Sequence, residues 1–181
     1  MGFEYETKVL DFDVEQVTKK LISIGADEKP ELLMRRWVFD WVEKDSDSIN
    51  EWIRLRDDGT KTTLTYKKKR TTGMSNTEEF EVVVGNFEKT AEILKKIPFK
   101  RKFYQESKRK LFVLDDIEFS IDTWPMLDPV MEIESSSNER VREALNMIGL
   151  KGKDIGDVSW NTLYDNIGIH LHDVKSLKFK E

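Results

Sequence analysis

Two glutamates stand two positions apart at three places in this sequence. Alternate side chains of a β-strand point to the same face, so each pair would place two carboxylates side by side. Paired carboxylates bind hard divalent cations such as Mg2+ and Mn2+. The three pairs are Glu4 with Glu6, Glu79 with Glu81, and Glu132 with Glu134.

Basic residues follow the same alternating spacing. Arg54 and Arg56 share a face of one predicted strand, and Lys67 and Lys69 share a face of the next. Arg and Lys bind phosphate oxygens, and Arg often does so through two parallel hydrogen bonds. Carboxylates for a metal ion, together with cations for phosphate, are the groups that phosphoryl or nucleotidyl transfer requires.

Strands must position most of these side chains. Apolar and charged residues alternate in about eight segments, which is typical of strands with one buried face. Short turns such as Asp57-Asp58-Gly59 join most of them, so the strands are predicted to be mostly antiparallel. The segments are residues 3–10, 33–42, 51–56, 62–69, 79–84, 101–113, 117–123 and 130–134.

Four helices are predicted to cover the apolar faces of these strands. The first is capped by Asp13 and the third by Asn138, while the second follows Asn86 and the fourth follows Ser159. A strand, a helix and three strands occur twice in succession, which indicates a pseudo-symmetric sheet. We therefore expect one α+β domain of residues 1–181, an eight-stranded antiparallel β-barrel with flanking helices. The predicted helices are residues 14–24, 87–97, 139–148 and 160–167.

An antiparallel sheet with one face in water also alternates apolar and charged residues. Two features of the whole set favour a charged barrel interior instead. The polar faces are almost wholly charged, and single strands carry one sign of charge. Such an interior is costly unless the charges are neutralised by one another, by metal ions or by a polyanion.

The composition excludes several classes of protein. The net charge of −5 over 181 residues argues against a dedicated nucleic-acid binder. Cysteine is absent, which excludes disulfides and Cys-based zinc sites. No signal peptide is visible, and no apolar run approaches the ~20 residues that span a membrane. We therefore expect a cytoplasmic protein that binds neither nucleic acid nor a membrane.

A set of charged motifs appears in order along nearly the whole chain. It comprises Glu4, Glu6 and Lys8, Arg54 and Arg56 in WIRLR, Lys67 in LTYK, Glu79 and Glu81, Arg109 and Asp122, Glu132 and Glu134, and SWNTL at 159–163. The ordered set resembles the CYTH superfamily, the triphosphate tunnel metalloenzymes. This group includes class IV adenylyl cyclases, thiamine triphosphatases and inorganic triphosphatases.

The resemblance implies a role for each matching residue. A triphosphate-containing small molecule would lie in a β-tunnel, and Glu4, Glu6 and Lys8 would belong to the catalytic set. Glu79, Glu81 and Asp122 would support the site by sharing in metal binding or orienting the cations. The implied ligands of Mg2+ or Mn2+ are Glu4, Glu6, Glu132 and Glu134. The implied phosphate-binding residues are Lys8, Arg54, Arg56, Lys67 and Arg109, with Lys69 added from its place on the same strand face as Lys67.

The sequence leaves several alternatives open. The expected activity is divalent-metal-dependent hydrolysis of a triphosphate. The alternatives are cyclisation of ATP to cyclic AMP and pyrophosphate and, after it, binding of polyphosphate or nucleotide without catalysis. Arg35 or Arg36 adds a basic contact where the family has an acidic and aromatic pattern, and Trp124 either stacks on a substrate ring or packs in the core. His170 and His172 are expected in a surface tail. The oligomeric state is open, with a homodimer among the alternatives.

Overall fold

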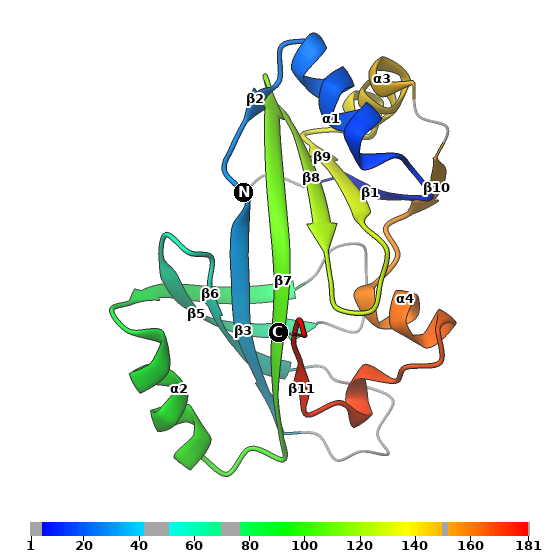
Figure 1. Ribbon diagram of the computed structural model, residues 1–181. Helices are drawn as coiled ribbons and strands as arrows, with labels where there is room; N and C mark the ends of the chain where they lie inside the picture. Colours follow the sequence, from blue (N-terminus) through cyan, green and yellow to red (C-terminus); the bar gives the residue numbers. More distant parts are fainter. Residues whose placement is uncertain (1–4, 42–50, 70–76, 150–151, 181) are drawn as a thin grey trace. The chain divides into compact units, whose positions relative to one another are not determined.

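The computed structural model describes residues 5–41, 51–69, 77–149 and 152–180, without the side chains of residues 69, 77, 101 and 172 (Figure 1). The chain divides into two units. Unit 1 comprises Met1–Leu32 and Lys108–Leu171, and unit 2 comprises Leu33–Ser107 and His172–Glu181. The long strand β7 (Arg101–Leu114) contributes its first half to unit 2 and its second half to unit 1.

Unit 1 contains an antiparallel ladder in the order β10-β1-β9-β8-β7. Its register places Lys8 opposite Glu132 and Arg109 opposite Asp122. The short strand β2 pairs with the end of β7. The strands are β1 (Tyr5–Leu10), β2 (Asp27–Glu28), β7 (Arg101–Leu114), β8 (Ile117–Thr123), β9 (Val130–Ser135) and β10 (Lys153–Gly156).

Helices α1 (Val14–Ser23) and α3 (Asn138–Ile148) cover one face of the unit 1 ladder. Their apolar stripes, among them Leu21 and Ala144, pack on strand residues that include Phe119 and Ile133, and all four side chains are fully buried. The helices bury the odd-numbered residues of β1, β8 and β9. The even-numbered, charged residues therefore lie on the other face.

The C-terminal part of unit 1 holds α4 (Trp160–Asn166) and ends at the 3-10 helix η1 (Leu171–Asp173). Tyr164 is fully buried and donates a hydrogen bond to the carbonyl oxygen of Pro125 at 2.7 Å. This bond fixes α4 to the loop between β8 and β9.

Unit 2 continues the sheet in the order β7-β3-β4-β5-β6. Helix α2 (Phe87–Lys96) packs on one face through Phe87, Ala91 and Leu94, against a core that includes Phe39 and Leu55. The strands are β3 (Leu32–Asp40), β4 (Glu51–Asp57), β5 (Thr62–Lys69), β6 (Thr77–Val84) and β11 (Ser176–Leu177), which runs parallel to β7.

The α+β class, the antiparallel sheet with flanking helices and the eight predicted strands are confirmed. Three short strands, β2, β10 and β11, were not predicted. The closed barrel is not seen in the pairings, because β10 and β6 are edge strands that pair with no further strand in the described residues. The cap of α3 is also corrected: Ser137, not Asn138, accepts from the first turn. In the described part of the chain, no helix is long and apolar enough to span a membrane.

Gly152 lies against β1 so closely that a side chain would not fit. A Cβ atom there would come within 2.5 Å of Val9 Cγ1 and 2.9 Å of the Leu10 carbonyl oxygen. We expect Gly152→Ala to lower the free energy of unfolding by about 1–3 kcal/mol, as overpacking does. Urea denaturation measures this. Gly85→Ala is the matched control, since no atom lies within 4 Å of its added Cβ. Equal stability of the two variants would contradict the contact.

Candidate active-site faces

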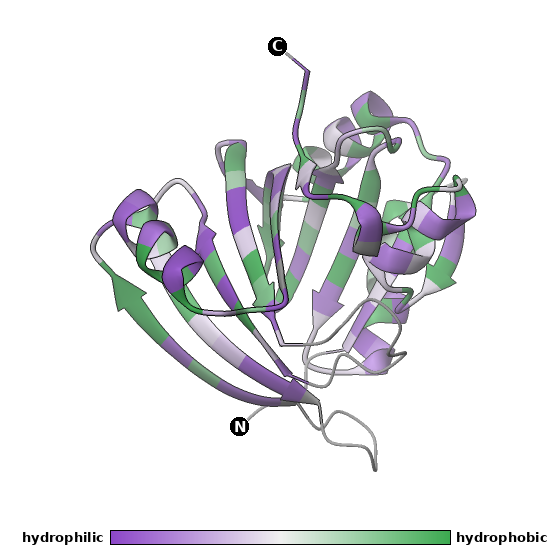
Figure 2. Cartoon of the chain, turned by 90° about the horizontal axis from the view of Figure 1, so that it is seen from below, coloured by the Kyte–Doolittle hydropathy of each residue, from purple (hydrophilic) through white to green (hydrophobic). Residues whose placement is uncertain are grey.

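Each unit carries one charged sheet face opposite its helices. Figure 2 shows hydrophilic and hydrophobic residues alternating along the strands. In unit 1 the register aligns Glu6 with Glu134 and Lys8 with Glu132 across β1 and β9. The alternate residues Glu6 and Lys8 therefore lie on the same strand face as the sequence predicted, and the register adds Glu132 and Glu134 beside them.

Lys8 lies at the centre of the unit 1 face. Its side chain is only 3% exposed, and its Nζ lies 2.8 Å from Glu6 Oε1, 3.4 Å from Glu132 Oε1 and 3.5 Å from Asp157 Oδ1. Burial opposes the ammonium charge, but the hydrogen bond to Glu6 and the field of Glu132 outweigh it and raise the pKa of Lys8. Lys8 is therefore a charged lysine surrounded by carboxylates.

Arg109 holds the other side of the same face. Its Nε donates to Asp122 at 2.7 Å, and one terminal nitrogen lies 2.5 Å from Asp122 and 2.6 Å from Glu132. Burial disfavours its charge, yet the bidentate pair with Asp122 keeps the pKa of Arg109 raised. Asp122 is thus placed to orient Arg109, one of the two roles that the resemblance implied for it.

Carboxylates outnumber cations on this face. Among the described residues, the ion pairs of this face join the carboxylates of Glu6, Asp122, Glu132 and Asp157 to the two cations Lys8 and Arg109. Burial raises the pKa of Glu6, and the nearby Asp157 carboxyl raises it further. Burial, followed by the charge of Asp122, raises the pKa of Glu132. In the part of this face that the structure describes, negative charge therefore exceeds positive charge.

The predicted metal ligands are only partly within the described residues. Glu6 and Glu134 lie directly opposite each other, and Glu132 is two residues away on β9. Glu4 lies outside the described residues. Among those described, no three acidic or histidine side chains are grouped closely enough to hold a metal ion.

The unit 2 face combines arginines, threonines and a second acidic pair. Lys67 forms an ion pair with Glu79 at 2.8 Å, and Thr65 donates to Glu81 at 2.8 Å. The hydrogen bond from Thr65 is the main cause of the lowered pKa of Glu81. Glu79 therefore contacts a cation of this face and Glu81 contacts a threonine hydroxyl.

Arg54 and Arg56 remain short of partners on that face. Within the described residues, the ion-pair contacts of Arg54 are the long ones to Glu79 and Glu81, both at 3.9 Å. Burial, followed by the charge of Arg56, lowers the pKa of Arg54. The Nε atoms of Arg54 and Arg56 and the hydroxyl of Thr63 are buried without a hydrogen-bond partner in the structure. Buried donors of this kind are costly unless an acceptor binds.

Arg35 and Arg36 point to opposite sides of β3. Arg36 belongs to the charged face, where it donates to Ser107 Oγ at 2.9 Å. Arg35 lies on the α2 side and pairs with Asp57 and Glu88. Of the two arginines that the sequence left open, Arg36 is the one that extends the basic face.

The structure brings most of the predicted site residues together within each unit, and it adds two that the sequence did not single out. Asp157 follows β10 in a loop, where no alternating pattern marks it. Thr63 lies opposite Arg56 in the β4–β5 ladder, a relation that only the register reveals. Nothing is described of the Lys69 side chain.

Trp124 and His170 make their described contacts with residues other than those of the charged faces. Trp124 is 3% exposed, and its ring is stacked on Trp160 at 4.6 Å between centroids. It packs in the core rather than on a substrate ring. His170 is exposed and pairs with Asp165 at 2.8 Å, while the His172 side chain is not described.

Comparison with known proteins supplies an independent line of evidence. The CYTH domain profile matches residues 3–154. A protein of Methanocaldococcus jannaschii, described as a candidate adenylate cyclase, is 30% identical over 137 residues, which cover 75% of this chain and 78% of that protein.

Two solved structures share the fold. The structure of a candidate adenylate cyclase from Vibrio parahaemolyticus aligns with a TM-score of 0.70 at 12% identity, covering 91% of this chain and 98% of the other. The structure of a Hippeastrum protein, described as a candidate adenylyl cyclase with a dominant triphosphatase activity, aligns with a TM-score of 0.58 at 17% identity. That alignment covers 96% of this chain and all of the other.

Proposed function

Because this chain belongs to the CYTH domain family, whose members include triphosphatases and adenylyl cyclases, we propose that it hydrolyses a small triphosphate with the help of a divalent cation. The substrate is inorganic triphosphate or a small organic or nucleoside triphosphate. The observation that carries this proposal is the group of buried donors on the unit 2 face, at Arg54, Arg56 and Thr63. A polyphosphate offers the acceptor oxygens that these donors lack.

The carboxylate oxygens of the unit 1 face are the kind of ligand that a hard cation prefers. Among its described residues the carboxylates outnumber the cations, and burial raises the pKa of Glu6 and of Glu132. A bound cation would offset this cost of burying their charges. We assign Glu6, Glu132 and Glu134, with Glu4, to a Mg2+ or Mn2+ ion. Such an ion, when bound, polarises a phosphoryl oxygen and lowers the pKa of a bound water.

The remaining side chains of unit 1 bind and orient. Lys8 neutralises Glu6 and Glu132 and keeps them in place, and it supplies a positive charge for a phosphate oxygen. Arg109, held rigidly by Asp122, presents its guanidinium to a second phosphate oxygen. On unit 2, Lys67 is held by Glu79 in the same way.

One assay panel tests the proposal. The purified chain is incubated with Mg2+ or Mn2+ and, separately, with inorganic triphosphate, thiamine triphosphate and ATP, and the release of phosphate, pyrophosphate and cyclic AMP is measured. We expect phosphate release from at least one triphosphate, abolished by EDTA. Tight triphosphate binding without turnover of any substrate would instead support a non-catalytic binding module.

Cyclisation of ATP to cyclic AMP and pyrophosphate is the second candidate. It is favoured by the 30% identical relative described as a candidate adenylate cyclase. Hydrolysis is preferred because Trp124, the aromatic residue that the sequence offered for stacking on a base, is committed to Trp160 and to the core. Cyclic AMP as the main product of the panel would reverse this order.

A further inference from the structure

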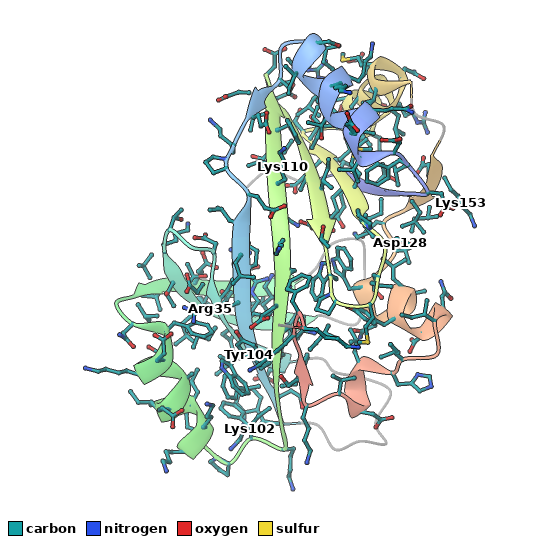
Figure 3. All side chains as sticks on the ribbon, in the orientation of Figure 1. Arg35, Lys102, Tyr104, Lys110, Asp128 and Lys153 are labelled. Atoms are coloured by element: carbon teal, nitrogen blue, oxygen red, sulfur yellow. The ribbon has the colours of Figure 1, made fainter. Side chains whose placement is uncertain are left out.

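A cavity of about 290 Å3 lies on the α2 side of unit 2, on the face of the sheet opposite Arg54 and Arg56. Residues of α2, β3, β7 and the segment that contains β11 line it. Figure 3 labels Arg35 on β3 and Tyr104 on β7, two of the lining residues. Since alternate residues of β3 point to opposite sides, Arg35 and Trp37 belong to this cavity and Arg36 to the charged face.

The floor of the cavity is aromatic and preformed. Phe87 and Tyr104 are 5% and 9% exposed, and the rings of Trp37 and Tyr104 lie 5.2 Å apart. The Tyr104 hydroxyl donates to Glu106 at 2.8 Å. Glu106 also accepts from the backbone of Phe179, which ties the C-terminal segment to β7. The planes of the Trp37 and Tyr104 rings are inclined at 58° to each other, so the cavity offers a bound ring two apolar surfaces set at an angle.

Two lysine ammonium groups lie over the aromatic rings that line the cavity. Lys95 Nζ lies 4.4 Å from the centre of the Trp37 ring, and Lys178 Nζ lies 4.9 Å from that of Tyr104. Lys95 also meets Glu92 in a solvent-exposed ion pair, which binds weakly. No ion pair joins Lys178 to any carboxylate that the structure describes. Two ammonium groups, from α2 and from the C-terminal segment, are thus available to an anion.

We propose that this cavity binds a small aromatic anion, with its ring on Trp37 and Tyr104 and its phosphate or carboxylate group between Lys95 and Lys178. The volume is close to the lower end of ligand pockets, about 300 Å3, and suits one ring system with one charged group. A cationic ligand is disfavoured because the ammonium groups of Lys95 and Lys178 would repel it. None of the residues that line this cavity has a role in the proposed hydrolysis of a triphosphate.

Calorimetric titration of the full chain in EDTA tests the proposal with defined probes. AMP is the probe for an aromatic ligand with a phosphate group, and benzoate is the probe for one with a carboxylate group. Adenosine has the ring of AMP without its phosphate, and inorganic phosphate has the anion without the ring. We expect AMP or benzoate to bind. If AMP binds, adenosine and phosphate should each bind at least about tenfold more weakly, because each loses one set of contacts.

Matched variants locate the binding. Lys178→Gln is expected to raise the Kd about tenfold, the cost of one charge-assisted contact, and Lys180→Gln, two residues further along the same exposed tail, to leave it unchanged. Arg56→Ala should also leave it unchanged. Absence of binding of both AMP and benzoate up to about 5 mM overturns the proposal, since weaker affinity is non-specific. Binding that is insensitive to Lys178→Gln, or lost in Arg56→Ala, overturns it too. Triphosphate turnover is assayed separately, so either proposal can fail alone.

Discussion

Glu132→Gln is expected to lower triphosphate turnover by at least about 100-fold, because loss of even an indirect metal partner costs about 10–100-fold. The substitution keeps the side-chain volume but removes the charge that we assign to the cation. Glu132 also contacts Lys8 and Arg109, at 3.4 and 2.6 Å. The measurement is steady-state phosphate release over a range of Mg2+ concentrations.

The fold should survive this change. Burial, followed by Asp122, raises the pKa of Glu132 in the folded state. A carboxyl group with a raised folded pKa costs stability at any pH above that pKa, and this cost disappears in a neutral glutamine. Lys8 and Arg109 keep Glu6 and Asp122 as partners. We therefore expect a melting temperature within about 4 °C of the parent chain.

Glu139→Gln is the matched control, since Glu139 is an exposed residue in the first turn of α3. It loses only a favourable interaction with the helix dipole and should keep full activity. If Glu132→Gln retains turnover and its dependence on Mg2+, Glu132 is not a metal ligand.

Arg56→Ala is expected to raise the Kd for inorganic triphosphate about 10–100-fold, because hydrogen bonds to charged groups contribute about 1.5–3 kcal/mol each. Calorimetry in EDTA measures this binding without turnover. The Nε of Arg56 has no hydrogen-bond partner in the structure. Its removal therefore breaks no hydrogen bond at that atom and should not lower the melting temperature of the ligand-free chain. Removal of Arg56 also relieves its repulsion of Arg54.

Two further variants sharpen this test. Arg56→Lys keeps the charge but loses the forked donor geometry, so its Kd should lie between those of the parent and of Arg56→Ala. Arg142→Ala removes an exposed arginine from α3 and should leave binding unchanged. Unchanged affinity in Arg56→Ala together with a large loss of stability would mean that Arg56 has a structural role instead.

The sequence predicted the local structure well because the relevant signals are local. Alternation placed Glu6 and Lys8 on one strand face, and the capping residues Asp13, Asn86 and Ser159 begin their helices as expected. The error at α3 has a local cause as well, since Ser137 and Asn138 are adjacent and both are good caps.

Pairing between distant strands was not predictable from these signals. The repeat of strand, helix and three strands suggested two successive halves, yet each unit mixes both. Helix α1 of the first repeat packs with Phe119 and Ile133 of the second, and α2 of the second packs with Phe39 and Leu55 of the first.

The sequence by itself determined the strands, the helices, the charged faces and the family, because a period of two residues fixes where each side chain points. Only the tertiary structure decided which charges meet. It placed Lys8 among Glu6, Glu132 and Asp157, and it left Arg54 and Arg56 with unpartnered donors. The physical reason is that an ion pair depends on strand register and on distances between residues far apart in the chain. Alternation along a single strand carries no information about either.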